Sequence, residues 1–145
     1  MGAILQVNRA CIAVFLSLGA SAVGAQEDGR ALYNSYCASC HGVELEGQPN
    51  WMSRNEAGRL PAPPHDETGH TWHHSDRQLL AITLDGLNVI SPGYESDMPA
   101  FADRLSETQV LEILDYIKGH WPDREREYQR LRSLRDPLRH EAAVE

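Results

Sequence analysis

The chain has 145 residues, with 21 acidic and 13 basic side chains and a formal net charge of −8 at pH 7. This length is typical of one domain with one small core, and so acidic a chain argues against binding to nucleic acid or to anionic lipid. We therefore expect protein partners that carry a basic docking patch.

Residues 1–25 have the features of a secretory signal peptide. One charge, Arg9, precedes an apolar run over residues 10–23, and small residues lead to Ala25. Such a run is short for a bilayer span, and its end resembles an A-x-A cleavage site. We expect cleavage after Ala25, no stable membrane insertion of the mature chain, and export to the periplasm or a similar compartment. An uncleaved anchor is the competing interpretation, whereas Cys11 precedes most of the apolar run and so does not fit a lipoprotein.

The segment over residues 27–36 predicts the first helix. Acidic residues at its start suit the positive end of a helix dipole, and Leu32, Tyr33 and Tyr36 recur at helical spacing. A glycine inside a helix costs about 1 kcal/mol. Gly29 therefore indicates close approach by another backbone, unless it lies in a frayed first turn.

Two thiols and an imidazole follow this helix in the order Cys37, Cys40, His41. This C-x-x-C-H spacing is the attachment motif of c-type haem, in which both sulfurs bond to the porphyrin and the histidine binds the iron. A C-x-x-C pair also occurs in redox disulfides and zinc sites, but these need a preceding strand or a second ligand pair. Neither is found here, so we predict one covalent haem c per chain, with His41 as an axial ligand.

Glycines and prolines over residues 42–64 prevent this stretch from continuing the helix or forming a central strand. We expect a loop around the haem edge, in which a carbonyl of Pro49 or of the 61–64 proline run accepts the Nδ1 proton of His41.

Three side chains of this region, Trp51, Arg54 and Trp72, can donate hydrogen bonds to haem propionates. Plain packing of the tryptophans and a solvated arginine explain the same residues equally well.

Four histidines lie within ten residues, together with two acidic side chains, and this cluster has the composition of a second metal site. They are His65, His70, His73 and His74, with Asp66 and Glu67. However, no H-E-x-x-H spacing is present, and histidines in such a loop more often form hydrogen bonds or face water. The sequence leaves both interpretations open.

Two capping boxes predict the next two helices. The first, Ser75–Gln78, begins a helix of about a dozen residues that ends near Gly86. The second, Ser106–Gln109, begins an amphipathic helix that ends at Gly119, shortly before Pro122.

The order of these features over residues 27–122 resembles the single-haem class I cytochromes c. Gly29 and Tyr33 match the glycine and aromatic residue of that family's first helix, and Ile113 and Tyr116 match its last helix. The resemblance implies a small all-α fold of three or more helices wrapped around one haem. The long loop with histidines and prolines departs from the short family pattern.

In that family a methionine before the last helix supplies the sixth iron ligand, and Met98 occupies this place. A thioether is a soft ligand that favours ferrous iron. Met52 is the rival, but it follows His41 closely and would have to cross to the other haem face. With both axial positions filled, we expect a single-electron carrier between redox partner proteins, and no enzyme. A haem enzyme, or a gas or metal sensor with a labile distal ligand, is the alternative.

The expected organisation is therefore a signal peptide (1–25), a cytochrome c domain (26–122) and a charged extension (123–145). Apolar residues at three-residue steps from Tyr128 to Leu134 predict a short helix in the extension. The extension is expected to be solvated or to dock on a partner. In both cases its removal should leave the haem site unchanged.

Overall fold

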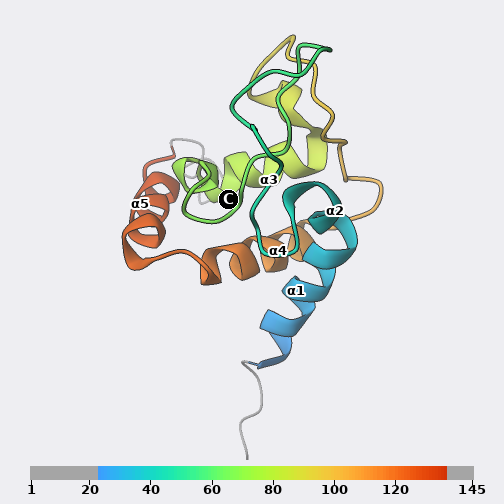
Figure 1. The fold of residues 1–145 in the computed structure, drawn as a ribbon. Helices are drawn as coiled ribbons and strands as arrows, with labels where there is room; N and C mark the ends of the chain where they lie inside the picture. The colour runs from blue at the N-terminus through green and yellow to red at the C-terminus, as the bar shows by residue number, and fades with distance from the viewer. Residues whose placement is uncertain (1–22, 137–145) are drawn as a thin grey trace, which may run out of the picture.

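The computed structural model describes residues 23–136, with side chains from residue 29 onward, so most of the predicted signal peptide, including Cys11, lies outside the described residues. Within this range the chain forms helices and no strand, which confirms the all-α prediction. The elements are α1 (Val23–Tyr36), α2 (Ala38–His41), η1 (Thr71–His73), α3 (Asp76–Asp85), η2 (Leu87–Val89), α4 (Glu107–Gly119) and α5 (Asp123–Leu134). Figure 1 shows long loops before and after α3 that extend together beyond the helices.

Helices α1 and α4 cross at Gly29, where the two backbones are in contact. A Cβ atom at this position would lie 2.3 Å from the carbonyl oxygen of Glu112 and 3.2 Å from the Cβ of Tyr116. Only glycine allows so close an approach. One helical turn later, the rings of Tyr33 and Tyr116 pack with their centroids 5.4 Å apart. The close backbone contact predicted from Gly29 is confirmed.

Helices α3 and α4 begin with the predicted capping boxes. The Ser75 hydroxyl accepts from the backbone N–H of Gln78, and the Gln78 side chain accepts from the backbone N–H of Ser75. Ser106 and Gln109 make the same reciprocal pair. Each box satisfies two backbone donors that a helix start leaves without partners, which typically contributes about 1 kcal/mol.

The buried face of α4 contributes more residues to the core than any other element does. Its members are Tyr33, Ala38, Leu45, Leu79, Phe101, Leu105, Val110, Ile113, Leu114, Tyr116, Ile117 and Trp121. Cys37 and Met98 are partly buried and pack against this same cluster. The attachment motif and the candidate distal ligand therefore adjoin one core, although they are far apart in sequence.

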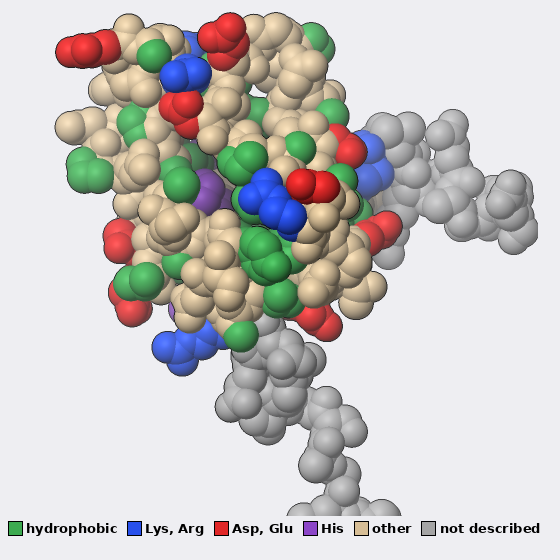
Figure 2. Space-filling model, turned by 90° about the vertical axis from the view of Figure 1, so that its right-hand side faces the viewer, with side chains coloured by type: hydrophobic (Ala, Val, Ile, Leu, Met, Phe, Trp, Pro, Cys, Tyr) green, Lys and Arg blue, Asp and Glu red, His purple; other side chains and the backbone are tan. Residues whose placement is uncertain are grey.

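Figure 2 shows the face of the molecule that lies to the right in Figure 1, where α2 and the loop before α4 run. Hydrophobic side chains lie around a histidine near the middle of this face, with a basic and an acidic side chain beside them, and most other charged side chains lie nearer the edges. Cys40 is exposed, and the side chain of Val43 just after the motif is 61% exposed.

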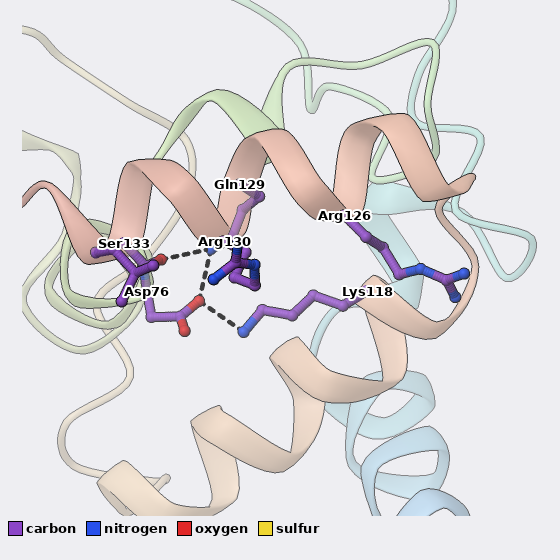
Figure 3. A pocket seen from close by; sticks show the side chains of 7 residues that line it. Asp76, Lys118, Arg126, Gln129, Arg130 and Ser133 are labelled. Carbon is purple, nitrogen blue, oxygen red and sulfur yellow. Dashed lines mark hydrogen bonds and ion pairs between the residues drawn. The ribbon is translucent and has the colours of Figure 1, made fainter.

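Helix α5 forms as predicted, but residues 123–136 are not a solvated extension. Gln129 is buried, and its amide donates to the carbonyl of His74 at 3.3 Å and to Asp76 Oδ1 at 2.6 Å. Lys118 of α4 pairs with the same Asp76 oxygen at 2.6 Å, so Asp76 joins three helices (Figure 3). Helix α5 is therefore held against the start of α3 by hydrogen bonds of the buried Gln129 side chain.

Further contacts hold α5 against η1, and the residues after α5 against the start of α3. Arg132 donates to the carbonyl of His73 at 3.0 Å, and the ring of Tyr128 meets the ring of Trp72 edge-on at 5.3 Å. Beyond the helix, Asp136 is buried and accepts hydrogen bonds from Ser75 and Arg77. The sequence did not predict this packing, because the residues that make it are mostly polar.

A pocket of about 230 Å³ lies at the junction of α3, α4 and α5 (Figure 3). Its three basic side chains, Lys118, Arg126 and Arg130, all pair with carboxylates. The pocket therefore has little free positive charge for an anion, and none of the motif residues lines it.

Candidate haem site

The C-x-x-C-H motif spans the junction of α1 and α2. The N–H of Cys37 still bonds to the carbonyl of Tyr33 at 2.8 Å, and the N–H of His41 bonds to the carbonyl of Cys37 at 2.9 Å. The motif is thus one helical turn that continues from α1. This turn holds both thiols and the imidazole in a fixed local arrangement, as one-sided attachment to a porphyrin requires.

The thiols of Cys37 and Cys40 are not joined in a disulfide. Burial, with a smaller contribution from the neighbouring Cys40, raises the pKa of the Cys37 thiol to about 12. A redox C-x-x-C site works through a thiol whose pKa is lowered. The environment of Cys37 therefore argues against a redox disulfide and agrees with haem attachment.

His41 is buried, and its Nδ1 lies 2.8 Å from the carbonyl oxygen of Pro63. Because a carbonyl oxygen only accepts hydrogen bonds, Nδ1 carries the proton and Nε2 keeps a lone pair for a metal. Burial lowers the pKa of His41, although the hydrogen bond opposes this effect. The ring is therefore neutral, as iron ligation requires. Among the carbonyls that the sequence left as alternatives, the carbonyl of Pro63 is the one that accepts the Nδ1 proton of His41.

The segment after His41 is tied back to α1 by Tyr33, which is fully buried. Its hydroxyl donates to the carbonyl of Gly42 at 2.8 Å. Gly42 itself has φ 83°, a conformation that favours glycine. Burial strongly raises the pKa of Tyr33, so its hydroxyl stays protonated and remains a donor.

The ring of His65 stacks on the ring of His41, with centroids 4.0 Å apart and planes 20° apart. Its Nδ1 lies 2.8 Å from the Thr71 hydroxyl. The pKa of His65 lies well below the ordinary value because of burial, and because His41 and His70 add repulsion. Sequence reasoning missed this contact with His41, for which no local pattern provides a signal.

The other three histidines of the loop have aromatic neighbours. His70 stacks on Trp51 with centroids 5.5 Å apart, His73 packs on Trp72 at 3.8 Å, and His74 meets His70 edge-on. Among the residues that the structure describes, no group of three or more His, Cys, Asp or Glu side chains is placed to hold a metal ion. The second metal site that the sequence left open therefore gains no support.

The two candidate thioethers differ in burial. Met98 is partly buried against the core, and its backbone N–H donates to the Ser96 hydroxyl at 3.1 Å. Met52 is 76% exposed. Because a ligand to buried iron must point into the protein, this difference favours Met98.

Contacts between two loops hold the Met98 segment near the loop that follows His41. The Tyr94 hydroxyl accepts from the backbone N–H of Leu60 at 3.0 Å, and the Arg54 guanidinium lies 5.5 Å from the centre of the Tyr94 ring. Arg59 pairs with Asp97, the neighbour of Met98, at 3.0 Å. No local sequence pattern marks this pairing.

Two of the three predicted propionate donors, Trp72 and Arg54, have protein partners. The single indole donor of Trp72 bonds to the carbonyl of Glu67 at 3.3 Å, and Arg54 donates to the carbonyl of Gly58 at 2.6 Å. Nε of Arg59 lies 3.0 Å from a carboxylate oxygen of Asp97, so this guanidinium also has a partner within the protein.

Taken together, these residues fit a covalently held haem. The motif offers two thiols and a neutral imidazole with an available Nε2, and a partly buried thioether adjoins the same core. The fold and the donor set define a c-type cytochrome.

Comparison with known proteins agrees with this assignment. The family model described as "Cytochrome C oxidase, cbb3-type, subunit III" matches residues 24–117, and the chain belongs to this family of haem-dependent electron-transfer domains. The chain is also similar to the fructose dehydrogenase cytochrome subunit of Gluconobacter japonicus, with 30% identity over 99 residues, which cover 65% of this chain and 18% of that protein. The chain thus spans about a fifth of the length of this relative. No solved structure matches it.

A search of the described residues found no helix that is both long and apolar enough to cross a membrane.

Proposed function

We propose that this protein is a single-electron carrier with one haem c, bound covalently through Cys37 and Cys40 and ligated by His41 and Met98. Bound haem supplies an iron that alternates between the ferrous and ferric states. The observation that carries the proposal is the environment of His41, whose Nδ1 proton is fixed by Pro63 while Nε2 remains available directly after the two thiols.

The chain's residues suit electron transfer better than catalysis. His41 and Met98 together fill both axial positions, so no position is left for a substrate. His41 is held in one tautomer, and the side chain of Met98 packs against the core, so neither ligand needs to move when the charge changes. The electron donor and acceptor are redox proteins with a basic docking patch, since the chain carries a net charge of −8.

The relative named as the cytochrome subunit of a fructose dehydrogenase points to a dehydrogenase as one such partner. We place the mature protein in the periplasm or another exported location, because residues 1–25 resemble a signal peptide and c-type haem is attached outside the cytoplasm.

Haem staining of the denatured protein tests the covalent bond. The parent should stain, and Cys37→Ala combined with Cys40→Ala should abolish the stain, while the control Cys11→Ala keeps it. Redox titration should then give a one-electron transition. The reduced protein should not bind carbon monoxide at neutral pH, and rapid formation of a carbon monoxide adduct would instead indicate an open distal site and a haem enzyme or gas sensor.

A further inference from the structure

The segment from Pro63 to His65 contacts the ring of His41 in two different ways. The Pro63 carbonyl accepts the proton at the Nδ1 edge, at 2.8 Å. The His65 ring covers one face, at 4.0 Å between centroids and with planes 20° apart. Face-to-face stacking leaves the Nε2 edge clear. One short segment therefore restrains the ring at an edge and at a face and does not block the metal-binding atom.

His65 is itself held by four segments of the chain. Its backbone N–H donates to the carbonyl of Leu45 at 2.8 Å, and its carbonyl accepts from the indole of Trp121 at 2.7 Å. Its ring meets the buried hydroxyl of Thr71 at 2.8 Å and the ring of Tyr33 edge-on at 6.2 Å. Rotation of the His65 ring would break the contact with Thr71, so the orientation of this ring is fixed.

The hydrogen bond to Pro63 alone does not fix the plane of the His41 ring. A ring held at one edge can still tilt about the direction of that bond. Tilting would drive the His41 ring into His65, whose own position is set by the four contacts above. The stacked His65 ring thus prevents the tilt of the His41 ring that the hydrogen bond to Pro63 alone would allow.

We propose that His65 is a positioning residue that fixes the orientation of the His41 ring plane, an inference that rests on the proposed role of His41 as an iron ligand. Outer partners of a ligating histidine set its tautomer and orientation. In a low-spin ferric haem, the orientation of the axial imidazole plane determines how unpaired spin is distributed over the porphyrin. His65 therefore selects which porphyrin positions carry that spin.

The test is the proton NMR spectrum of the full ferric haem protein, in which the shifts of the four haem methyl groups report the imidazole plane. His65→Ala should change the order or the spread of these shifts. His65→Phe, which keeps a flat ring, should remain closer to the parent. The control His73→Ala removes an exposed histidine of the same loop and should leave the pattern unchanged. An unchanged pattern in folded His65→Ala would overturn the inference.

If His65→Ala does not fold, Thr71→Val provides a milder variant, since it keeps the shape of the side chain and removes the contact to the His65 ring. Thr71→Val should shift the methyl resonances, but by less than complete removal of the His65 ring would shift them. An unchanged pattern would count against the inference. A parent protein without a low-spin ferric spectrum would refute the proposed function. A normal parent spectrum with unresponsive variants would refute only the role of His65.

Discussion

The two candidate iron ligands are held in contrasting ways. On the proximal side His41 is buried in a helical turn, hydrogen-bonded by Pro63 and covered by His65. On the distal side Met98 belongs to a largely exposed segment, residues 88–100, and only a few contacts tie that segment to the loop of Leu60. His41 is buried within the helical part of the protein, whereas Met98 is carried by a loop that packs against the core.

This difference has a thermodynamic consequence. Segments with few buried contacts open at lower free energy than the core does. Local opening of the Met98 segment should therefore release the thioether while the rest of the protein stays folded. Release of His41 requires the core itself to open. The proximal side should set global stability, and the distal side should set the ease of ligand exchange.

Met98→Ala has the largest expected effect on the distal side. The haem should stay covalently bound, the sixth position should become accessible to water or added imidazole, and the midpoint potential should fall by on the order of 0.2 V, a fraction of the range that axial ligands span. Optical spectra report the access of added ligands to the sixth position, and a redox titration gives the midpoint potential. The matched control Met52→Ala should change neither the access nor the potential, because Met52 is exposed. If the two variants exchange their phenotypes, Met52 is the ligand.

Gln129→Ala tests how much the packing of α5 against η1 and α3 contributes to the stability of the protein. It removes buried donors to the carbonyl of His74 and to Asp76, and should lower the free energy of unfolding by about 2 kcal/mol in urea denaturation. Glu127→Ala, which breaks an exposed pair with Arg130, should cost less than about 1 kcal/mol. Equal effects would show that the packing of α5 is unimportant. Truncation after Pro122, which the sequence predicted to leave the haem site unchanged, should lower the free energy of unfolding by more than Gln129→Ala does.

The features that the sequence predicted correctly have local or strongly periodic signals. The capping boxes at Ser75 and Ser106 involve residues three apart, and the apolar face of α4 repeats at helical spacing. Gly29 signalled a close contact because a glycine inside a helix needs a reason. Pro63 was one of several carbonyls that the proline run offered, and only the folded loop distinguishes between them.

The features that the sequence did not predict depend on polar contacts between distant segments. The stacking of His65 on His41, the pairing of Arg59 with Asp97, and the burial of Gln129 are all of this kind. Arginine, aspartate and glutamine are residue types that are mostly exposed, and histidine is intermediate. No periodicity marks such residues, so composition and spacing suggested solvated loops where the structure has packed ones.

Tyr33→Phe tests a single buried hydrogen bond on the proximal side. It removes the shorter of two hydrogen bonds to the carbonyl of Gly42, which also accepts from the N–H of Leu45, and should lower the free energy of unfolding by about 1 kcal/mol. Tyr128→Phe, at a half-exposed ring on α5, should be nearly neutral. Urea denaturation of the haem protein measures both. A neutral Tyr33→Phe would mean that the segment after His41 is not held by this bond.

Tyr94→Phe should have the smallest effect on stability but a distinct effect on the distal ligand. It removes the acceptor of the Leu60 N–H, an exposed bond that water replaces, so the free energy of unfolding should fall by about 0.5 kcal/mol or less. If that loss falls on the Met98 segment alone, the apparent affinity for imidazole, which displaces the thioether, should rise about twofold. A change of 1.4 kcal/mol corresponds to a factor of ten in an equilibrium constant, so a change of about 0.5 kcal/mol corresponds to about a factor of two. Asp97→Asn, which weakens the neighbouring pair with Arg59, should act in the same direction. Tyr33→Phe should cost more stability and leave the imidazole affinity unchanged. If Tyr33→Phe raises that affinity as much as Tyr94→Phe does, the two sides open together and the contrast between them is wrong.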